Sequence, residues 1–236
     1  MFEVSDAPIV SSDDPNALEK DDFIYTHQPS SPVVLESHKL VFFTVPLVGA
    51  TTWEQLFRRM MGCDDWQTHP FKLPDDGLKY LYHYKLEDAR RIMKEYTVAM
   101  MVREPKQRLF DVYQTYSGDY FVERCCPKAQ SARTRCEMRS KMFTAWASDT
   151  HTCDLPKWRP QGYWMDPKFY QQLDYVLQFE SAEHDAMELL TNIGAWRQYG
   201  SSGRGDGNTI FNNRSAEVVA GRENRRVMVN RFRAGL

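Results

Sequence analysis

The chain has 236 residues and a formal net charge of −2 at pH 7. This length suits one substantial core, and the nearly balanced charge argues against binding nucleic acid or a membrane surface through bulk charge. No apolar run approaches the roughly 18 residues that a transmembrane helix needs, and the acidic, polar start of the chain does not resemble a signal peptide.

The cysteines leave the redox state of the chain open. Cys125, Cys126, Cys136 and Cys153 lie close together in the sequence and could pair, whereas Cys63 stands apart. Their spacings match no zinc signature, so we expect no metal site. An odd number of cysteines without a signal peptide favours free thiols in a reducing compartment.

The first regular element is predicted at residues 39–45, a run of apolar, β-branched and aromatic residues typical of a buried strand. Pro46 ends the strand, a loop of small residues follows, and Thr51 or Thr52 can cap a helix. The apolar face of that helix carries Trp53, Leu56, Phe57 and Met60. Such a turn directs backbone N–H groups and a positive helix end at one point, which suits a phosphate or sulfate. An ordinary connection between a strand and a helix is the alternative.

The remaining elements follow from periodicity and helix-start signals. In chain order they are a helix at 86–96, a strand at 96–102, a helix from Pro105, a short helix at 137–148, a strand at 174–180 and a helix after Ser181. Residues 1–36 are rich in Asp, Ser and Pro and are predicted to form an irregular arm, and residues 37–199 an α/β domain. Residues 200–236 are predicted to be a flexible linker and a basic segment.

Strands that alternate with helices predict an α/β protein of three layers, with a central, mostly parallel sheet and helices on both faces. Ligands of such sheets bind at the carboxyl ends of the strands. The 46–52 loop and Arg103 each follow the end of a predicted strand. We therefore expect them to face one crevice.

Three separated stretches carry a resemblance to a known family. They are "FFTVPLVGATTW", "VREPKQRLFDVY", and "WRPQ" followed by "DYVLQFE" and an acidic helix. In this order and spacing they resemble the carbohydrate-type, Golgi-like sulfotransferases, which have a P-loop NTPase-like fold. That family takes a sulfuryl group from 3′-phosphoadenosine 5′-phosphosulfate. The kinase loop GxxxxGK[ST] is absent, which disfavours a nucleotide-type kinase.

The resemblance implies a sulfotransferase that acts on a hydroxyl of a saccharide or related acceptor, without a metal. It assigns the 5′-phosphosulfate to the loop residues Leu47, Val48, Gly49, Ala50, Thr51 and Thr52. It assigns the 3′-phosphate to Arg103. The alternative is that Arg103 forms a structural ion pair. His83, in "YLYHYK", is the candidate general base, with Glu104 and Glu180 as second choices. Packing of His83 in a half-buried strand is the alternative.

Two positions depart from the family pattern. Leu47 stands where the family has a lysine that neutralises the leaving phosphate, and Asp111 stands where it has a serine on the 3′-phosphate. A catalytically degenerate relative that binds a nucleotide or sulfated glycan without transfer would show such losses. Alternatively, another cation supplies the missing charge; the candidates are Lys85, Lys106, Arg58 and Arg59.

The acceptor and the compartment stay open. Trp66, Trp158, Tyr163 and Trp164 could stack on sugar rings or could cap the core. The chain is expected to be cytoplasmic, or to lie in the Golgi lumen or membrane if an anchor lies outside this chain.

Overall fold

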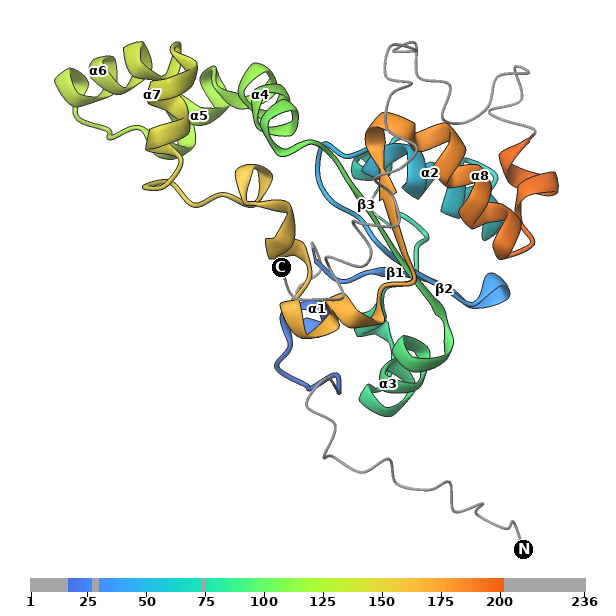
Figure 1. Ribbon diagram of the computed structural model, residues 1–236. Coiled ribbons are helices and arrows are strands. Elements are labelled where there is room, and N and C mark those ends of the chain that lie inside the picture. The colour runs from blue at the N-terminus through green and yellow to red at the C-terminus, as the bar shows by residue number, and fades with distance from the viewer. Residues whose placement is uncertain (1–16, 27–29, 74, 202–236) are drawn as a thin grey trace, which may run out of the picture.

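The computed structural model describes residues 17–26, 30–73 and 75–201 (Figure 1). Its helices are α1 (Phe23–Thr26), α2 (Ala50–Met60), α3 (Leu86–Glu95), α4 (Pro105–Tyr116), α5 (Asp119–Cys125), α6 (Gln130–Ser140), α7 (Phe143–Asp149) and α8 (Ala182–Asn192). Its strands are β1 (Val33–Leu35), β2 (Leu40–Phe43), β3 (Thr97–Val102) and β4 (Tyr175–Gln178). The predicted linker and basic segment lie outside the described residues, except for their first two positions.

The four strands form one sheet in the order β1-β2-β3-β4. β2 and β4 each pair with β3 in parallel, so the three predicted strands are parallel neighbours, as expected. β1 pairs with β2 antiparallel. Because β1 lies within residues 1–36, the prediction of an irregular arm is wrong there. The sheet is therefore mostly parallel with one antiparallel edge.

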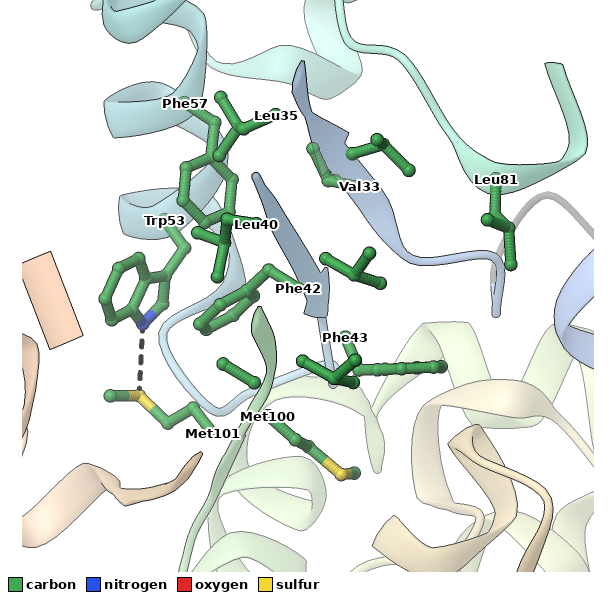
Figure 2. Close-up of a cluster of buried hydrophobic side chains, with 14 of the residues drawn as sticks. Val33, Leu35, Leu40, Phe42, Phe43, Trp53, Phe57, Leu81, Met100 and Met101 are labelled. Carbon is green, nitrogen blue, oxygen red and sulfur yellow. Dashed lines mark hydrogen bonds between the residues drawn. The ribbon is translucent and has the colours of Figure 1, made fainter. Parts of the chain in front are cut away.

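Alternating side chains of β2 serve opposite faces of the sheet. Leu40 and Phe42 pack toward α2, where the Phe42 ring lies 4.5 Å from the Trp53 ring (Figure 2). The indole of Trp53 donates to the sulfur of Met101 across 3.3 Å. α2 and α8 lie on one side of the sheet, and α1 and α3 lie on the other (Figure 1). The predicted α/β class with helices on both faces is confirmed.

A second apolar cluster lies in the lobe of α4–α7, which projects from the carboxyl edge of the sheet (Figure 1). Its buried members are Val112, Phe121, Val122, Cys126, Trp146 and Trp158. Two disulfides, Cys125–Cys153 and Cys126–Cys136, cross-link this lobe. The expectation of free thiols is therefore wrong for these four cysteines, and Cys63 alone is a free thiol.

Several helix ends differ from the prediction. α2 begins after Gly49, which has a φ of 73°, so Thr51 and Thr52 lie inside the helix and do not cap it. The region of the predicted helix at 137–148 is divided between α6 and α7. Ser181 precedes α8, but its hydroxyl donates to the Asp185 carboxylate and makes no cap. No helix in the described part of the chain has the length and apolar character to cross a membrane.

Glu54 is a buried carboxyl group on α2. Its side chain is 8% exposed, and its Oε2 atom has no hydrogen-bond partner within the described residues. Burial, with a smaller contribution from the negative charge of Asp76, raises the pKa of Glu54 to about 7. The folded protein therefore favours the protonated form of Glu54 more than the unfolded chain does.

This raised pKa predicts a pH-dependent stability. The contribution of protonated Glu54 is fully present below the unfolded pKa of 4.5 and is lost as pH rises through about 7. Glu54→Gln removes the loss, so at pH 8 the variant should exceed the parent in unfolding free energy by up to about 3 kcal/mol. At pH 4 the two proteins should be equal. Urea unfolding at both pH values measures this, with the exposed Glu95→Gln as the control; equal stabilities of parent and Glu54→Gln at pH 8 would contradict the assignment.

Candidate active site

The loop between β2 and α2 has the backbone of an anion-binding turn. Leu47 and Gly49 have positive φ angles of 62° and 73°. The N–H groups of Gly49, Ala50 and Thr51 have no acceptor within the described residues, whereas that of Val48 donates to the Val45 carbonyl. The N–H of Thr52 likewise donates to the Gly49 carbonyl. Of the predicted phosphosulfate-binding amides, those of residues 49–51 are therefore the ones free to bind an anion.

Leu47 does two things in this loop. Its backbone adopts a left-handed conformation that a leucine seldom occupies and that costs free energy. Its side chain packs against the second apolar cluster, in the lobe of α4–α7. The loop is thus fastened to that lobe at the position where the family has a lysine.

Arg103 directly follows β3 and reaches the loop. Its Nη1 donates to the Leu47 carbonyl across 3.3 Å, and its guanidinium lies 4.4 Å above the Phe179 ring. The Gln161 side chain bonds the backbone N–H and carbonyl of Arg103 at 2.8 and 2.7 Å. The structure therefore brings Arg103 and the loop together at the carboxyl edge of the sheet, as the sequence predicts.

Arg103 also forms the ion pair that the sequence left open. Its Nη1 lies 2.6 Å from Oδ2 of Asp111, one of the two residues that depart from the family pattern. The Arg103 side chain is 13% exposed, and its Nε has no partner within the described residues. The guanidinium is thus held at the pocket by an ion pair, a carbonyl and a ring.

Arg108 is a site residue that sequence reasoning missed. It is 3% exposed and donates to three carbonyls, those of Pro46, Lys157 and Arg159, at 3.0, 3.2 and 2.9 Å. Burial, and then the positive charge of Arg103, lower the pKa of Arg108 to about 10. An arginine on a helix usually lies in solvent, and only its place in "VREPKQRL" could have marked it. Arg108 joins the loop, α4 and the "WRPQ" segment.

His83 ends a 3-10 turn (Leu81–His83) and is exposed, so it does not lie in the half-buried strand considered as the alternative. Its Nδ1 accepts from the backbone N–H of Tyr80 at 3.2 Å, and its ring contacts that of Tyr82 at 4.2 Å. In a neutral ring whose Nδ1 is an acceptor, Nε2 carries the proton and donates. The structure gives His83 no contact with the loop or with Arg103. Its role as the base stays a prediction.

The second-choice carboxylates have structural partners. Glu104 caps α4, and hydrogen bonds from the N–H groups of Gln107 and Lys106 lower the pKa of Glu104. Glu180 accepts from the backbone N–H of Glu104 at 2.8 Å. Both carboxylates therefore hold the start of α4.

The four side chains that could supply the charge missing at Leu47 differ in their surroundings. Arg58 is buried and pairs with Asp65, and Arg59 donates to the Tyr199 carbonyl. Both lie near the far end of α2 from the loop. Lys85 precedes α3, and Lys106 lies in the first turn of α4. Lys106 is thus the candidate nearest to Arg103 along the chain.

The predicted sugar-stacking residues divide into two groups. Trp158 and Trp164 are buried and belong to the core, whereas Tyr163 is 40% exposed with Arg159 stacked on its ring at 4.0 Å. Trp66 is half-buried, with the Arg59 guanidinium 5.3 Å from its ring centre. A surface hollow near Thr97 lies at the amino ends of β3 and β4, at the opposite edge of the sheet from the candidate site.

The three carbonyl contacts of Arg108 generate a prediction. Lysine keeps the charge but lacks the planar fork that reaches three acceptors, so Arg108→Lys should lower the unfolding free energy by about 3 kcal/mol. Urea unfolding of this variant beside the exposed Arg91→Lys gives the comparison. A change below about 0.5 kcal/mol would show that Arg108 does not hold the site together.

Comparison with known proteins identifies the family of the chain. The model of the Sulfotransferase family matches residues 31–232. The chain is 31% identical over 88 residues to carbohydrate sulfotransferase 11 of Danio rerio, covering 35% of this chain and 25% of the relative. It is 27% identical over 140 residues to carbohydrate sulfotransferase 11 of Rattus norvegicus, covering 51% and 40%. It is 24% identical over 196 residues to carbohydrate sulfotransferase 9 of Homo sapiens, covering 72% and 42%.

These matches extend over less than half of each relative's length. No solved structure matches the chain. The family model, in contrast, covers most of the chain and includes the loop, Arg103 and the "WRPQ" segment. The chain belongs to the Sulfotransferase family.

Proposed function

We propose that this chain transfers a sulfuryl group from an adenosine phosphosulfate to a hydroxyl group of a saccharide. The observation that carries the proposal is the contact between Arg103 and the Leu47 carbonyl, which brings the two motif stretches together at the carboxyl edge of the sheet. Membership of the Sulfotransferase family supports the reaction class, and the family generally implies 3′-phosphoadenosine 5′-phosphosulfate as the donor. The names of the relatives support a carbohydrate acceptor.

The chemistry requires hydrogen-bond donors around the phosphosulfate, because charge develops on the departing phosphate. The N–H groups of Gly49, Ala50 and Thr51, at the positive end of α2, suit that role. Gly49 suits this turn because its φ of 73° is a left-handed conformation that glycine adopts without the steric cost of a Cβ. Arg103 stands beside them as a fixed cation.

Leu47, at the position where the resemblance implies a lysine, motivates a rival proposal of binding without transfer. Because the Leu47 side chain packs in the second cluster, it offers no charge to the leaving phosphate. A chain without that charge could bind a nucleotide or a sulfated glycan and transfer nothing. Lys106, exposed in the first turn of α4, is the side chain that we propose as a substitute.

For the base we propose His83 with its ring reoriented. Once Nδ1 is released from the Tyr80 N–H, the proton of the ring can move from Nε2 to Nδ1, and Nε2 can then take the proton of the saccharide hydroxyl. Binding of the saccharide beside the 3-10 turn would supply the new partner for the ring.

The disulfides bear on the compartment. Cys125–Cys153 and Cys126–Cys136 persist where thiols are oxidised and are rare where glutathione keeps them reduced. We therefore place the chain in an oxidising lumen rather than in the cytoplasm.

Transfer from sulfur-35-labelled donors to a panel of saccharides tests the function. Both 3′-phosphoadenosine 5′-phosphosulfate and adenosine 5′-phosphosulfate should be offered. The expected result is a labelled product with at least one acceptor. Nucleotide binding without any labelled product would favour the rival proposal.

Arg103→Ala tests the donor pocket. Loss of a charge-assisted clamp on the 3′-phosphate costs roughly 2–3 kcal/mol, so affinity for adenosine 3′,5′-bisphosphate should fall by tens of fold. Calorimetry measures this, with Arg91→Ala on the surface of α3 as the control. An Arg103→Ala protein that binds as tightly as the parent would show that Arg103 serves the fold alone.

His83→Ala tests the base. Turnover should fall by a factor on the order of 10²–10⁴ while nucleotide affinity is retained, as for loss of a general base. His151→Ala, at an exposed turn, is the matched control. Unchanged turnover in the His83 variant would remove His83 from the mechanism.

A further inference from the structure

Asp111 forms an ion pair with the guanidinium that a nucleotide phosphate would contact. Its Oδ2 lies 2.6 Å from Arg103 Nη1, and its Oδ1 accepts from Gln107 Nε2 at 3.2 Å. The same Nη1 donates to the Leu47 carbonyl at 3.3 Å. Nη1 is therefore shared between a carboxylate and a carbonyl, whereas Nε has no hydrogen-bond partner within the described residues.

The ion pair also changes the charge of the pocket. Arg103 and Asp111 together carry no net charge, and Asp111 is 29% exposed beside the more deeply buried Arg103. A phosphate monoester placed against this pair meets a carboxylate at short range, and like charges at short range repel. Its oxygens accept and do not donate, so they can form no hydrogen bond with an ionised Asp111.

Ribose hydroxyl groups suit the same pair. An ionised carboxylate has further lone pairs beyond those used by Arg103 and Gln107, and a hydroxyl donates to them. Dinucleotide-binding folds make the same distinction: a carboxylate there bonds a free ribose hydroxyl, and an arginine accommodates a ribose phosphate. In this chain the arginine is present, but a carboxylate is paired with it and offsets its charge.

We propose that Asp111 makes the donor pocket select an adenosine 5′-phosphosulfate with free ribose hydroxyls over the 3′-phosphorylated donor. The proposal rests on the proposed function and specifies its donor. In the reaction, the bond between sulfur and the bridging oxygen of the phosphosulfate breaks, and a bond forms between sulfur and the acceptor oxygen. AMP departs with the electron pair of the broken bond, and the hydroxyl proton passes to the base. No redox step is involved.

Calorimetry with AMP and with adenosine 3′,5′-bisphosphate, the two leaving nucleotides, tests the selection. The parent protein should bind AMP at least about tenfold more tightly than the bisphosphate, which corresponds to about 1.4 kcal/mol. Asp111→Ser frees Arg103 and restores the family residue, so it should raise bisphosphate affinity and reverse the preference. Asp64→Ser, which removes an exposed carboxylate after α2, should leave the preference unchanged.

Asp111→Asn is the second variant, because it preserves the shape of the side chain and removes its charge. In this variant the ratio of AMP affinity to bisphosphate affinity should be smaller than in the parent. The same measurement on Asp111→Asn replaces that on Asp111→Ser if the serine variant does not fold. A parent that binds the bisphosphate as tightly as AMP overturns the inference and leaves the proposed function intact. If neither nucleotide binds the folded parent or the folded variants, the donor pocket itself is refuted, and the proposed function fails with it.

Discussion

The buried guanidinium of Arg108 is the contact on which the candidate site depends. It donates to carbonyls of the loop after β2 and of the segment that follows the disulfide-linked lobe, while its own helix, α4, follows β3. A buried charge is costly unless it is hydrogen-bonded, and each of the three guanidinium nitrogens donates to a carbonyl here. The bonds fix the segments relative to one another, and Arg103, five residues earlier, is thereby aimed at the loop.

Leu47 and Asp111, the two departures from the family pattern, both lie beside the segments that Arg108 connects. Leu47 gives the loop an apolar attachment to the lobe of α4–α7, in exchange for the charge of a lysine. Asp111 pairs with Arg103 and presents a carboxylate where the resemblance implies a serine hydroxyl. Both changes reduce the positive charge of the pocket. A site with less positive charge suits a sulfuryl donor that carries fewer negative charges.

The sequence predicted the features that depend on local pattern. The β2, β3 and β4 runs are apolar and β-branched, so their parallel pairing and the meeting of the loop with Arg103 followed from strand–helix alternation. Features set by partners distant in sequence were not predictable in this way. The antiparallel strand β1, the carbonyl partners of Arg108 and the pairing of the cysteines each depend on contacts that only the folded chain brings together. The orientation of the His83 ring is of the same kind, since it is set by one backbone N–H.

A crystal structure of the protein with bound AMP tests the central claim most directly. The account predicts the 5′-phosphate on the N–H groups of Gly49, Ala50 and Thr51, and a ribose hydroxyl donating to Asp111 while the Arg103–Asp111 ion pair stays closed. A nucleotide bound at the opposite edge of the sheet, near Thr97, would contradict it. So would a 5′-phosphate seated on Arg103 with Asp111 displaced.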